Sequence, residues 1–198
     1  FSDTTLWGAS YMPNVDIFKL HFENGGFEPV MDYPLDFPLL STQTKRDIFG
    51  CYFSAKPDNS KLAITYANQA VLKIIDVKSN KSVQIEYKDF PDLSSNFRIN
   101  EMSDQIDKES LRIFSWRVRS TNQFIYIKVY DVLYKDLIVD GRIDEDFIPA
   151  IHIFDWSGKP IRAIQPDQYY KNFDVSSDDK YIITISEYVD NYYVKYDL

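Results

Sequence analysis

The chain carries Phe53-Ser-Ala-Lys-Pro-Asp-Asn-Ser-Lys-Leu-Ala-Ile-Thr-Tyr66, continued by Ile74-Ile75-Asp76, and a similar stretch returns near its end. The second copy is Phe173-Asp-Val-Ser-Ser-Asp-Asp-Lys-Tyr-Ile-Ile-Thr-Ile185, continued by Lys195-Tyr196-Asp197. Each copy predicts a strand, a polar turn, a second strand and a third strand that ends at an Asp. A unit of this kind cannot bury both faces of its small sheet alone, so the repeat predicts similar sheets stacked on one another.

The composition supports an all-β chain. Its 198 residues are 44% hydrophobic and 16% aromatic, with 15 Tyr and 14 Phe. Aromatic and β-branched side chains pack well on a pleated surface, so this content favours strands. The apolar runs are short, and none approaches the ~18–20 residues that a bilayer-spanning helix needs. The chain begins with Phe1, so we expect a processed or truncated product.

The formal net charge of −8 argues against two classes of partner. Nucleic-acid binding depends largely on Lys and Arg that neutralise phosphates, and docking to anionic lipid depends on basic clusters. The Lys and Arg residues are scattered, so neither partner is expected. The single cysteine, Cys51, excludes an internal disulfide and a multi-thiolate metal site, and its strand-like setting predicts a small buried hydrophobe.

Alternating apolar residues between turn-forming residues predict strands along most of the chain. Glu23-Asn24-Gly25-Gly26 is expected to form a hairpin turn, because glycine tolerates positive φ. A short helix is expected over 103–109. The predicted strands are 6–11, 17–22, 28–32, 50–55, 62–67, 71–77, 82–87, 113–119, 124–130, 150–156, 160–164, 173–175, 181–187 and 192–196.

The strands group into four sheet units. Their third strands share a pattern, seen in Ile17-Phe-Lys-Leu, Ile74-Ile-Asp-Val, Ile153-Phe-Asp-Trp and Val194-Lys-Tyr-Asp-Leu. The first and last units show three strands each, as expected of a ring that shares one sheet between its two chain ends, or of an array cut within a blade. We predict a single β-propeller domain or fragment of four-stranded antiparallel blades over 1–198. Its blades are expected over 1–40, 48–90, 111–165 and 172–198, with insertions over 91–110 and 132–149.

The segment Ile151-His-Ile-Phe-Asp-Trp-Ser-Gly-Lys-Pro-Ile161 resembles the TolB-like six-bladed β-propeller proteins of Bacteroides-type bacteria, as do Phe173 to Glu187 and the closing Lys195-Tyr-Asp-Leu198. The resemblance implies a cell-envelope or secreted protein, periplasmic or a surface lipoprotein, in a family mostly without an assigned activity. About four of six blades are visible, so it implies the C-terminal part of such a propeller. The motifs are strand and turn patterns, and no catalytic residue is carried over. Open blade faces are expected to self-associate.

Few residues are of the types that bind a cofactor or a metal ion, and we predict neither a cofactor nor a metal site. The acidic loop Asp140, Asp144, Glu145 and Asp146 lacks the EF-hand spacing and is interpreted as a solvated insertion rather than a calcium site. His21 and His152 are the only imidazoles, and each lies in an apolar strand pattern. They are too few for a zinc site, and no G-x-S-x-G motif occurs, so we interpret them as satisfied strand histidines.

Aromatic side chains offer a stacking surface for a sugar or a peptide. Trp7 and Trp116 fall inside strand patterns, where packing between blades is the default. Tyr169 and Tyr170 lie in the loop over 165–171, where propellers place binding surfaces, and are the predicted ligand-binding residues. Trp156, Tyr192 and Tyr193 are further candidates for such a platform.

Asp76, Asp155 and Asp197 recur at strand ends before turns. Their periodic position predicts that they accept backbone N–H bonds in the following turn. A catalytic carboxylate pair needs two groups about 5–10 Å apart across a cleft, whereas equivalent positions on different blades diverge. We therefore predict a structural role for all three.

The sequence favours a non-enzymatic binding or scaffold module whose ligand is a glycan, a peptide or a protein partner. The alternative is an enzyme, a hydrolase or lyase with its site at the channel mouth and partly in missing blades, because propellers host such activities on the same scaffold. A third interpretation is a purely structural role in holding other envelope components. Converging carboxylates with perturbed pKa values would favour the enzyme, and an aromatic-rimmed surface without them would favour binding.

Overall fold

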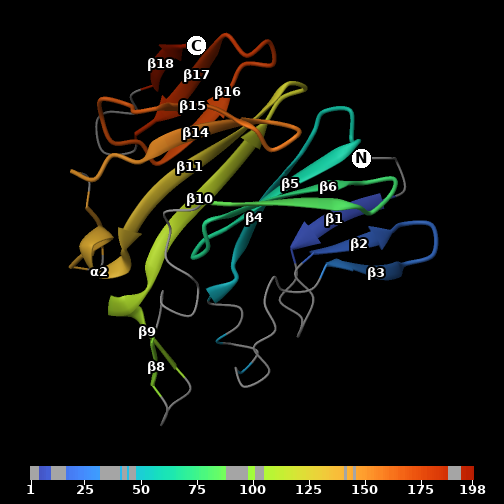
Figure 1. Cartoon of the computed structure of the whole chain (residues 1–198), viewed down its shortest axis with the longest axis horizontal. Coiled ribbons are helices and arrows are strands. Elements are labelled where there is room, and N and C mark those ends of the chain that lie inside the picture. The colour runs from blue at the N-terminus through green and yellow to red at the C-terminus, as the bar shows by residue number, and fades with distance from the viewer. Residues whose placement is uncertain are drawn as a thin grey trace.

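The computed structural model describes residues 5–9, 17–31, 41, 44, 48–87, 98–100, 105–140, 142–144, 146–186 and 193–198. Antiparallel sheets dominate it, and they follow one another across the molecule in chain order (Figure 1). The first sheet contains β1 (Thr5–Ala9), β2 (Ile17–His21) and β3 (Gly26–Met31). The predicted hairpin turn joins β2 to β3, with Gly25 at φ +64° and the Asn24 side chain accepting the Gly26 N–H bond at 2.7 Å.

The second sheet is a complete four-stranded meander. It contains β4 (Cys51–Ala55), β5 (Lys61–Tyr66), β6 (Val71–Asp76) and β7 (Ser82–Glu86), hydrogen-bonded in that order. Asn59 and Asn80 take positive φ in its two outer turns, a conformation that Asn tolerates better than most residues. This sheet corresponds to the first copy of the repeat.

The third sheet contains β10 (Arg112–Ser120), β11 (Phe124–Leu133), β14 (Ala150–Asp155) and β15 (Pro160–Ile164). The insertion between β11 and β14 holds α2 (Tyr134–Leu137), β12 (Ile138–Val139) and β13 (Arg142–Ile143). The fourth sheet has three strands in the described residues, β16 (Asn172–Val175), β17 (Tyr181–Ile185) and β18 (Tyr193–Asp197). All four sheets lie within the predicted ranges, while the grouping of these ranges into one domain stays a prediction.

The helix expected over 103–109 is wrong in the part that the structure describes. Instead, β8 (Arg98–Asn100) pairs with β9 (Gln105–Asp107), and a 3₁₀ turn covers Lys108–Ser110. The Asp107 carboxylate accepts the Glu109 N–H bond at 3.1 Å. A helix this short is marginal on its own, so strand pairing and a capped turn prevail.

Apolar clusters lie between successive sheets. Ile17 of β2 joins Leu62, Ile64 and Ile75 between the first and second sheets. Residues of the second and third sheets form another cluster, and residues of the third and fourth sheets form a third. The two central strands of the third sheet, β11 and β14, therefore alternate their side chains between two neighbouring sheets, which confirms that the sheets stack.

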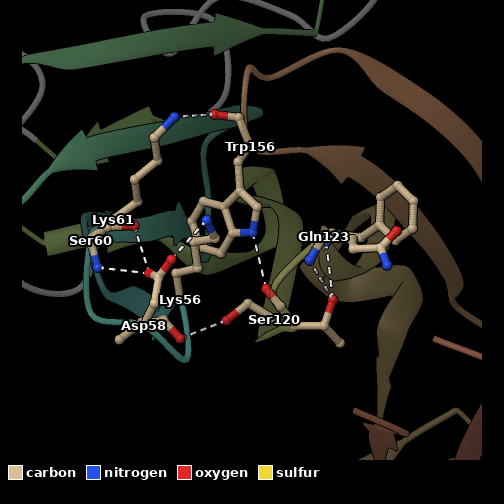
Figure 2. A network of polar contacts seen from close by, with 10 residues as sticks. Lys56, Asp58, Ser60, Lys61, Ser120, Gln123 and Trp156 are labelled. Atoms are coloured by element: carbon tan, nitrogen blue, oxygen red, sulfur yellow. Dashed lines mark hydrogen bonds and ion pairs between the residues drawn. The ribbon is translucent and has the colours of Figure 1, made fainter. Parts of the chain in front are cut away.

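Hydrogen bonds from turns add to the junction between the second and third sheets (Figure 2). The Trp156 indole donates to the Thr121 carbonyl at 3.0 Å, and the Lys61 ammonium donates to the Trp156 carbonyl at 2.9 Å. The Ser120 hydroxyl donates to the Ala55 carbonyl at 2.8 Å. The Lys61 and Ser120 bonds join the two sheets at one end of their interface. The Trp156 bond lies within the third sheet and satisfies a buried indole N–H.

Candidate functional site

Tyr87 and His152 form a polar pair between the second and third sheets. Tyr87 directly follows β7, and His152 lies in the middle of β14. The imidazole Nδ1 is 3.3 Å from the Tyr87 hydroxyl oxygen, and the two rings stack with centroids 5.7 Å apart at 28°. The pair therefore joins the two sheets through both a hydrogen bond and ring contact.

Strand alternation explains why these side chains meet. His152 and Phe154 share one face of β14, which is turned toward the second sheet, whereas Ile151 and Ile153 pack toward the fourth sheet. Tyr87 makes edge contacts with Phe114 and Phe154, at centroid distances of 4.7 and 5.8 Å. The aromatic contacts hold the Tyr87 ring in place.

Two hollows are lined by this pair. The first has a volume of about 360 Å³, and its walls include Ile85, Phe154, Ile161 and Ala163. The second has a volume of about 340 Å³, and its walls include Phe114, Tyr130, Phe147 and Gln165. We call the two hollows together the Tyr87–His152 cleft. Both volumes fall at the lower end of the range for small-ligand sites.

Burial keeps the central pair neutral. It raises the pKa of the Tyr87 hydroxyl well above its ordinary value, so the phenol stays protonated. Burial also lowers the pKa of His152, an effect that the Asp131 carboxylate opposes in part. At neutral pH the cleft therefore presents a neutral imidazole beside a neutral phenol.

The charged pair and the amide near the second hollow have partners, whereas the buried Tyr130 hydroxyl there has none in the described residues. The Arg112 guanidinium lies 2.6 Å from the Asp131 carboxylate and also donates to the Asp131 carbonyl at 3.1 Å. The Gln165 amide donates to the Ile148 carbonyl at 2.9 Å. Tyr130 contributes a buried ring stacked on Phe147, with centroids 6.0 Å apart at 16°. The second hollow thus has aromatic walls and a neutralised polar rim.

The predicted residues Tyr169 and Tyr170 lie on another interface, between the third and fourth sheets. They are 8% and 0% exposed, and the Tyr170 hydroxyl donates to the Pro149 carbonyl at 3.1 Å. Their ligand-binding role stays a prediction. The structure does not bring either residue into the Tyr87–His152 cleft.

Lys128 occupies the space beside these tyrosines. Its side chain is in β11 and is 2% exposed, and its ammonium donates at 2.9 Å to both the Tyr170 and Lys171 carbonyls. The nitrogen lies 4.6 Å from the Tyr170 ring centroid and 4.9 Å from that of Tyr130. Burial, aided by the nearby Arg117 charge, lowers the pKa of Lys128 to about 7. Carbonyl dipoles and π faces partly replace the lost hydration.

Two of the three recurring aspartates have the structural role that was predicted for all three. The Asp76 carboxylate accepts the Ser79 N–H bond at 2.8 Å, and the Asp155 carboxylate accepts bonds from Ser157 and Lys159. These bonds lower the pKa of both carboxyl groups. Asp197 departs from the pattern, because it pairs with the Lys195 ammonium at 2.7 Å within β18.

A side chain of the acidic loop hydrogen-bonds to the backbone of the same loop. The Asp144 carboxylate accepts the Asp146 N–H bond at 3.0 Å, and Asp140 takes a φ of +51°. Glu145 lies outside the described residues. Within the described ranges, no three His, Cys, Asp or Glu side chains converge as metal ligands do.

The remaining candidates take part in the packing. Trp7 and Trp116 lie half-buried against apolar clusters, as predicted, and Trp156 is buried. His21 contacts the Glu28 carboxylate at 3.1 Å, which confirms a satisfied strand histidine. Tyr193 is exposed on β18, and Tyr192 lies outside the described residues. Cys51 is half-buried rather than fully buried, because it sits at the start of an edge strand beside Gly50.

Sequence reasoning missed Tyr87 and Lys128. The available signal for Tyr87 was its position two residues after Ile85, on the same face of the strand pattern. For Lys128 it was a single charge inside the apolar run Phe124-Ile-Tyr-Ile-Lys-Val-Tyr130.

The family model for TolB-like 6-blade propeller-like proteins matches residues 34–178. The chain belongs to this family. The match covers the second and third sheets with their cleft, and the stacked four-stranded sheets are blades of this propeller family. No curated protein matches the chain in sequence. In the described residues, no helix is long and apolar enough to cross a membrane.

Several solved propellers have a similar fold. A DUF4221 family member from Bacteroides vulgatus has a TM-score of 0.58 at 7% identity, with 100% of this chain and 62% of that chain covered. An oligogalacturonate lyase in complex with manganese has a TM-score of 0.52 at 12% identity, with 98% and 45% covered. A chain of the mitotic checkpoint complex has a TM-score of 0.51 at 11% identity, with 98% and 52% covered. The chain thus spans about half the length of the last two, and these likenesses show the fold alone.

Proposed function

We propose that this chain is a non-enzymatic ligand- or protein-binding module of the cell envelope, and that its ligand enters the Tyr87–His152 cleft. The observation that supports this most is the pair of hollows of about 360 and 340 Å³ around one neutral Tyr–His pair. Aromatic walls with a few placed polar groups are typical of binding sites. Membership in the TolB-like propeller family supports the envelope setting.

The carboxylates with shifted pKa values favour binding over acid–base chemistry. Glu28, Asp58, Asp76, Asp155 and Asp178 all have lowered pKa values, caused first by hydrogen bonds to their ionised forms. They are exposed in turns or on a strand and stay ionised at neutral pH. A carboxyl group that acts as a general acid needs a raised pKa, and it needs to lie in the cleft.

The test compares two variants that place the same side chain at exposed strand positions. Ala163 lies directly opposite His152 in the pairing of β15 with β14, so Ala163→Trp fills the first hollow. Ser82→Trp puts an indole on exposed β7 outside both hollows. Thermal shift followed by titration calorimetry would use oligogalacturonate, xylan and mannan fragments and short peptides.

We expect at least one ligand class to bind the wild-type chain and Ser82→Trp, and to bind Ala163→Trp about tenfold more weakly or not at all. Binding that Ala163→Trp leaves unchanged, or no binding by any class, contradicts the proposed site. Chromatographic appearance of a cleaved ligand would support the hydrolase or lyase alternative instead.

A further inference from the structure

The polar groups of the Tyr87–His152 cleft indicate what kind of ligand group it takes, and this inference rests on the proposed function. We propose that the first hollow takes an uncharged phenol, whose ring lies against the apolar walls and whose hydroxyl meets the Tyr87–His152 pair. The phenol belongs either to a small molecule or to the tyrosine side chain of a peptide. The placement of nearby charges, the hydrogen-bonding capacity of the pair and the apolar walls all favour such a group.

Among the described residues that line the first hollow, no charged side chain faces it. Glu86 and Arg162 contribute to the lining, but strand alternation turns their side chains away. Glu86 lies opposite Val71 in the pairing of β7 with β6, and it accepts a hydrogen bond from the Gln84 amide at 2.7 Å. Arg162 lies opposite Ile153, on the face of β15 that is turned toward the fourth sheet. An ionised ligand group would therefore lose its hydration without gaining an ion-pair partner.

The second hollow offers no free charge either. Asp131 is the one charged residue among its described lining residues, and the Arg112 guanidinium lies 2.6 Å from the Asp131 carboxylate. A charged ligand would have to compete with this ion pair. An uncharged ligand has no such cost in either hollow.

The Tyr87–His152 pair offers a ligand one donor and at least one acceptor. If the Tyr87 phenol donates to Nδ1 across 3.3 Å, the imidazole Nε2–H is left as a donor and the phenol oxygen as an acceptor. If Nδ1–H donates instead, the phenol hydroxyl is left as the donor and Nε2 as an acceptor. Nε2 has no protein partner in the described residues and is open to the cleft. A ligand hydroxyl both donates and accepts, so it matches either tautomer, whereas a carboxylate only accepts and an ammonium only donates.

The walls of the first hollow suit an aromatic ring. Ile85, Phe154 and Ala163 supply apolar surface from β7, β14 and β15. An apolar cavity of ~150 Å³ holds benzene, so the first hollow, at about 360 Å³, has room for a phenol with a short alkyl chain. Contacts between aromatic rings contribute beyond the area that they bury, which favours a phenol over an aliphatic alcohol beside the stacked Tyr87 and His152 rings.

The experiment compares probes that share one propyl-substituted ring: 4-propylphenol, 4-propylanisole, propylbenzene and 4-propylbenzoate. Their substituents are a donor and acceptor, an acceptor alone, neither, and a charge. Binding to the whole chain at neutral pH is measured by ligand-observed NMR and titration calorimetry. Acetyl-Gly-Tyr-Gly-amide and its Phe counterpart test whether a peptide carries the phenol.

Two pairs of variants locate the binding. Tyr87→Phe removes the hydroxyl and keeps the ring, and Tyr193→Phe makes the same change at an exposed position on β18. Ala163→Trp and Ser82→Trp repeat the comparison without altering the Tyr87–His152 pair. Thermal unfolding of each variant checks that it is folded.

We expect 4-propylphenol to bind about tenfold more tightly than each of the other three probes. Tyr87→Phe should weaken the binding of 4-propylphenol about tenfold and leave that of propylbenzene unchanged, and Tyr193→Phe should change neither. Binding should be lost in Ala163→Trp and kept in Ser82→Trp. A Tyr peptide that binds more tightly than 4-propylphenol, and about tenfold more tightly than its Phe counterpart, identifies a peptide as the source, whereas a weaker one identifies a small molecule.

Propylbenzene or 4-propylbenzoate that binds as tightly as 4-propylphenol overturns the inference, and so do equal effects of Ala163→Trp and Ser82→Trp. A further outcome separates this inference from the proposed function. If a glycan fragment binds with sensitivity to Ala163→Trp while neither 4-propylphenol nor the Tyr peptide binds, the cleft is a ligand site and the phenol inference is overturned. If no probe, glycan or peptide binds, both proposals fail.

Discussion

Lys128 is a cation held without a carboxylate partner in the described residues. Its environment consists of two backbone carbonyls, the Tyr130, Tyr169 and Tyr170 rings and the Arg117 charge. The hydrogen bonds of this lysine tie β11 to the segment that leads into the fourth sheet. Because the ammonium group is buried, the removal of its proton costs less free energy than it does in water.

The stability of the chain should depend on pH through Lys128. Its pKa is about 7 in the folded state and has an ordinary value of 10.5, so the unfolded chain binds one more proton between these values. The free energy of unfolding should therefore rise with pH across this window, by up to ~1.4 kcal/mol per pH unit from this residue. Urea unfolding of the wild-type chain and Lys128→Met between pH 7.5 and 9 measures the difference.

Lys128→Met keeps much of the side-chain length while it removes the charge, so its unfolding free energy should lack this rise. Tyrosine ionisation falls above this pH window, because the ordinary tyrosine pKa is 10.0 and the pKa values of Tyr87, Tyr126, Tyr130 and Tyr170 are raised further in the folded chain. Parallel pH profiles for the two proteins would show that Lys128 stays charged throughout.

At the scale of elements, the hairpin turn between β14 and β15 shapes the first hollow. Gly158 takes a φ of +87°, and a Cβ atom at this position would clash with the Ile85 side chain of β7. The Asp155 carboxylate closes the same turn by accepting the Ser157 and Lys159 N–H bonds. The turn can approach β7 closely because residue 158 has no side chain.

Gly158→Ala should therefore lower the free energy of unfolding more than the same change at a glycine that also has a positive φ but has open surroundings. Gly25 is the matched control, with φ +64° and no atom within 4 Å of the place that a Cβ would take. We expect Gly25→Ala to lower the unfolding free energy by about 1–2 kcal/mol and Gly158→Ala by about 2–4 kcal/mol. Equal losses in urea unfolding would show that Ile85 moves aside freely.

Sequence patterns predicted strands better than they predicted the candidate site. Strands and turns follow from local periodicity and from Asx turns such as those of Asp76 and Asp155, so the repeat located them. The Tyr87–His152 pair joins residues 65 positions apart, and its existence depends on how two sheets pack. No local pattern contains that information. The expected helix over 103–109 failed for a more local reason, because residues 105–107 pair with β8, which lies only five to nine positions earlier in the chain.

At the scale of the whole molecule, the outer sheets differ from the middle ones. The β1–β3 and β16–β18 sheets have three strands in the described residues, whereas the second and third sheets have four. Tyr193 on β18 and Phe27 on β3 are exposed. Exposed apolar residues on incomplete sheets favour pairing with another chain.

We therefore expect concentration-dependent self-association, measured by light scattering with intact mass as the reference. The mass should rise above the 23.3 kDa of one chain as the concentration increases. Ala163→Trp should not change this association, because residue 163 lies on the third sheet, away from the outer sheets. A constant mass of one chain at all concentrations would show that the outer sheets are already covered.

The buried Trp156 indole also gives the protein an internal optical reporter. It lies at the junction of the second and third sheets, whereas Trp7 and Trp116 are half-buried elsewhere. Trp7→Phe combined with Trp116→Phe would leave a single tryptophan, and its emission wavelength follows the polarity of that junction. Ligand entry between the two sheets would then be visible as a spectral shift, without a label and before the ligand is identified.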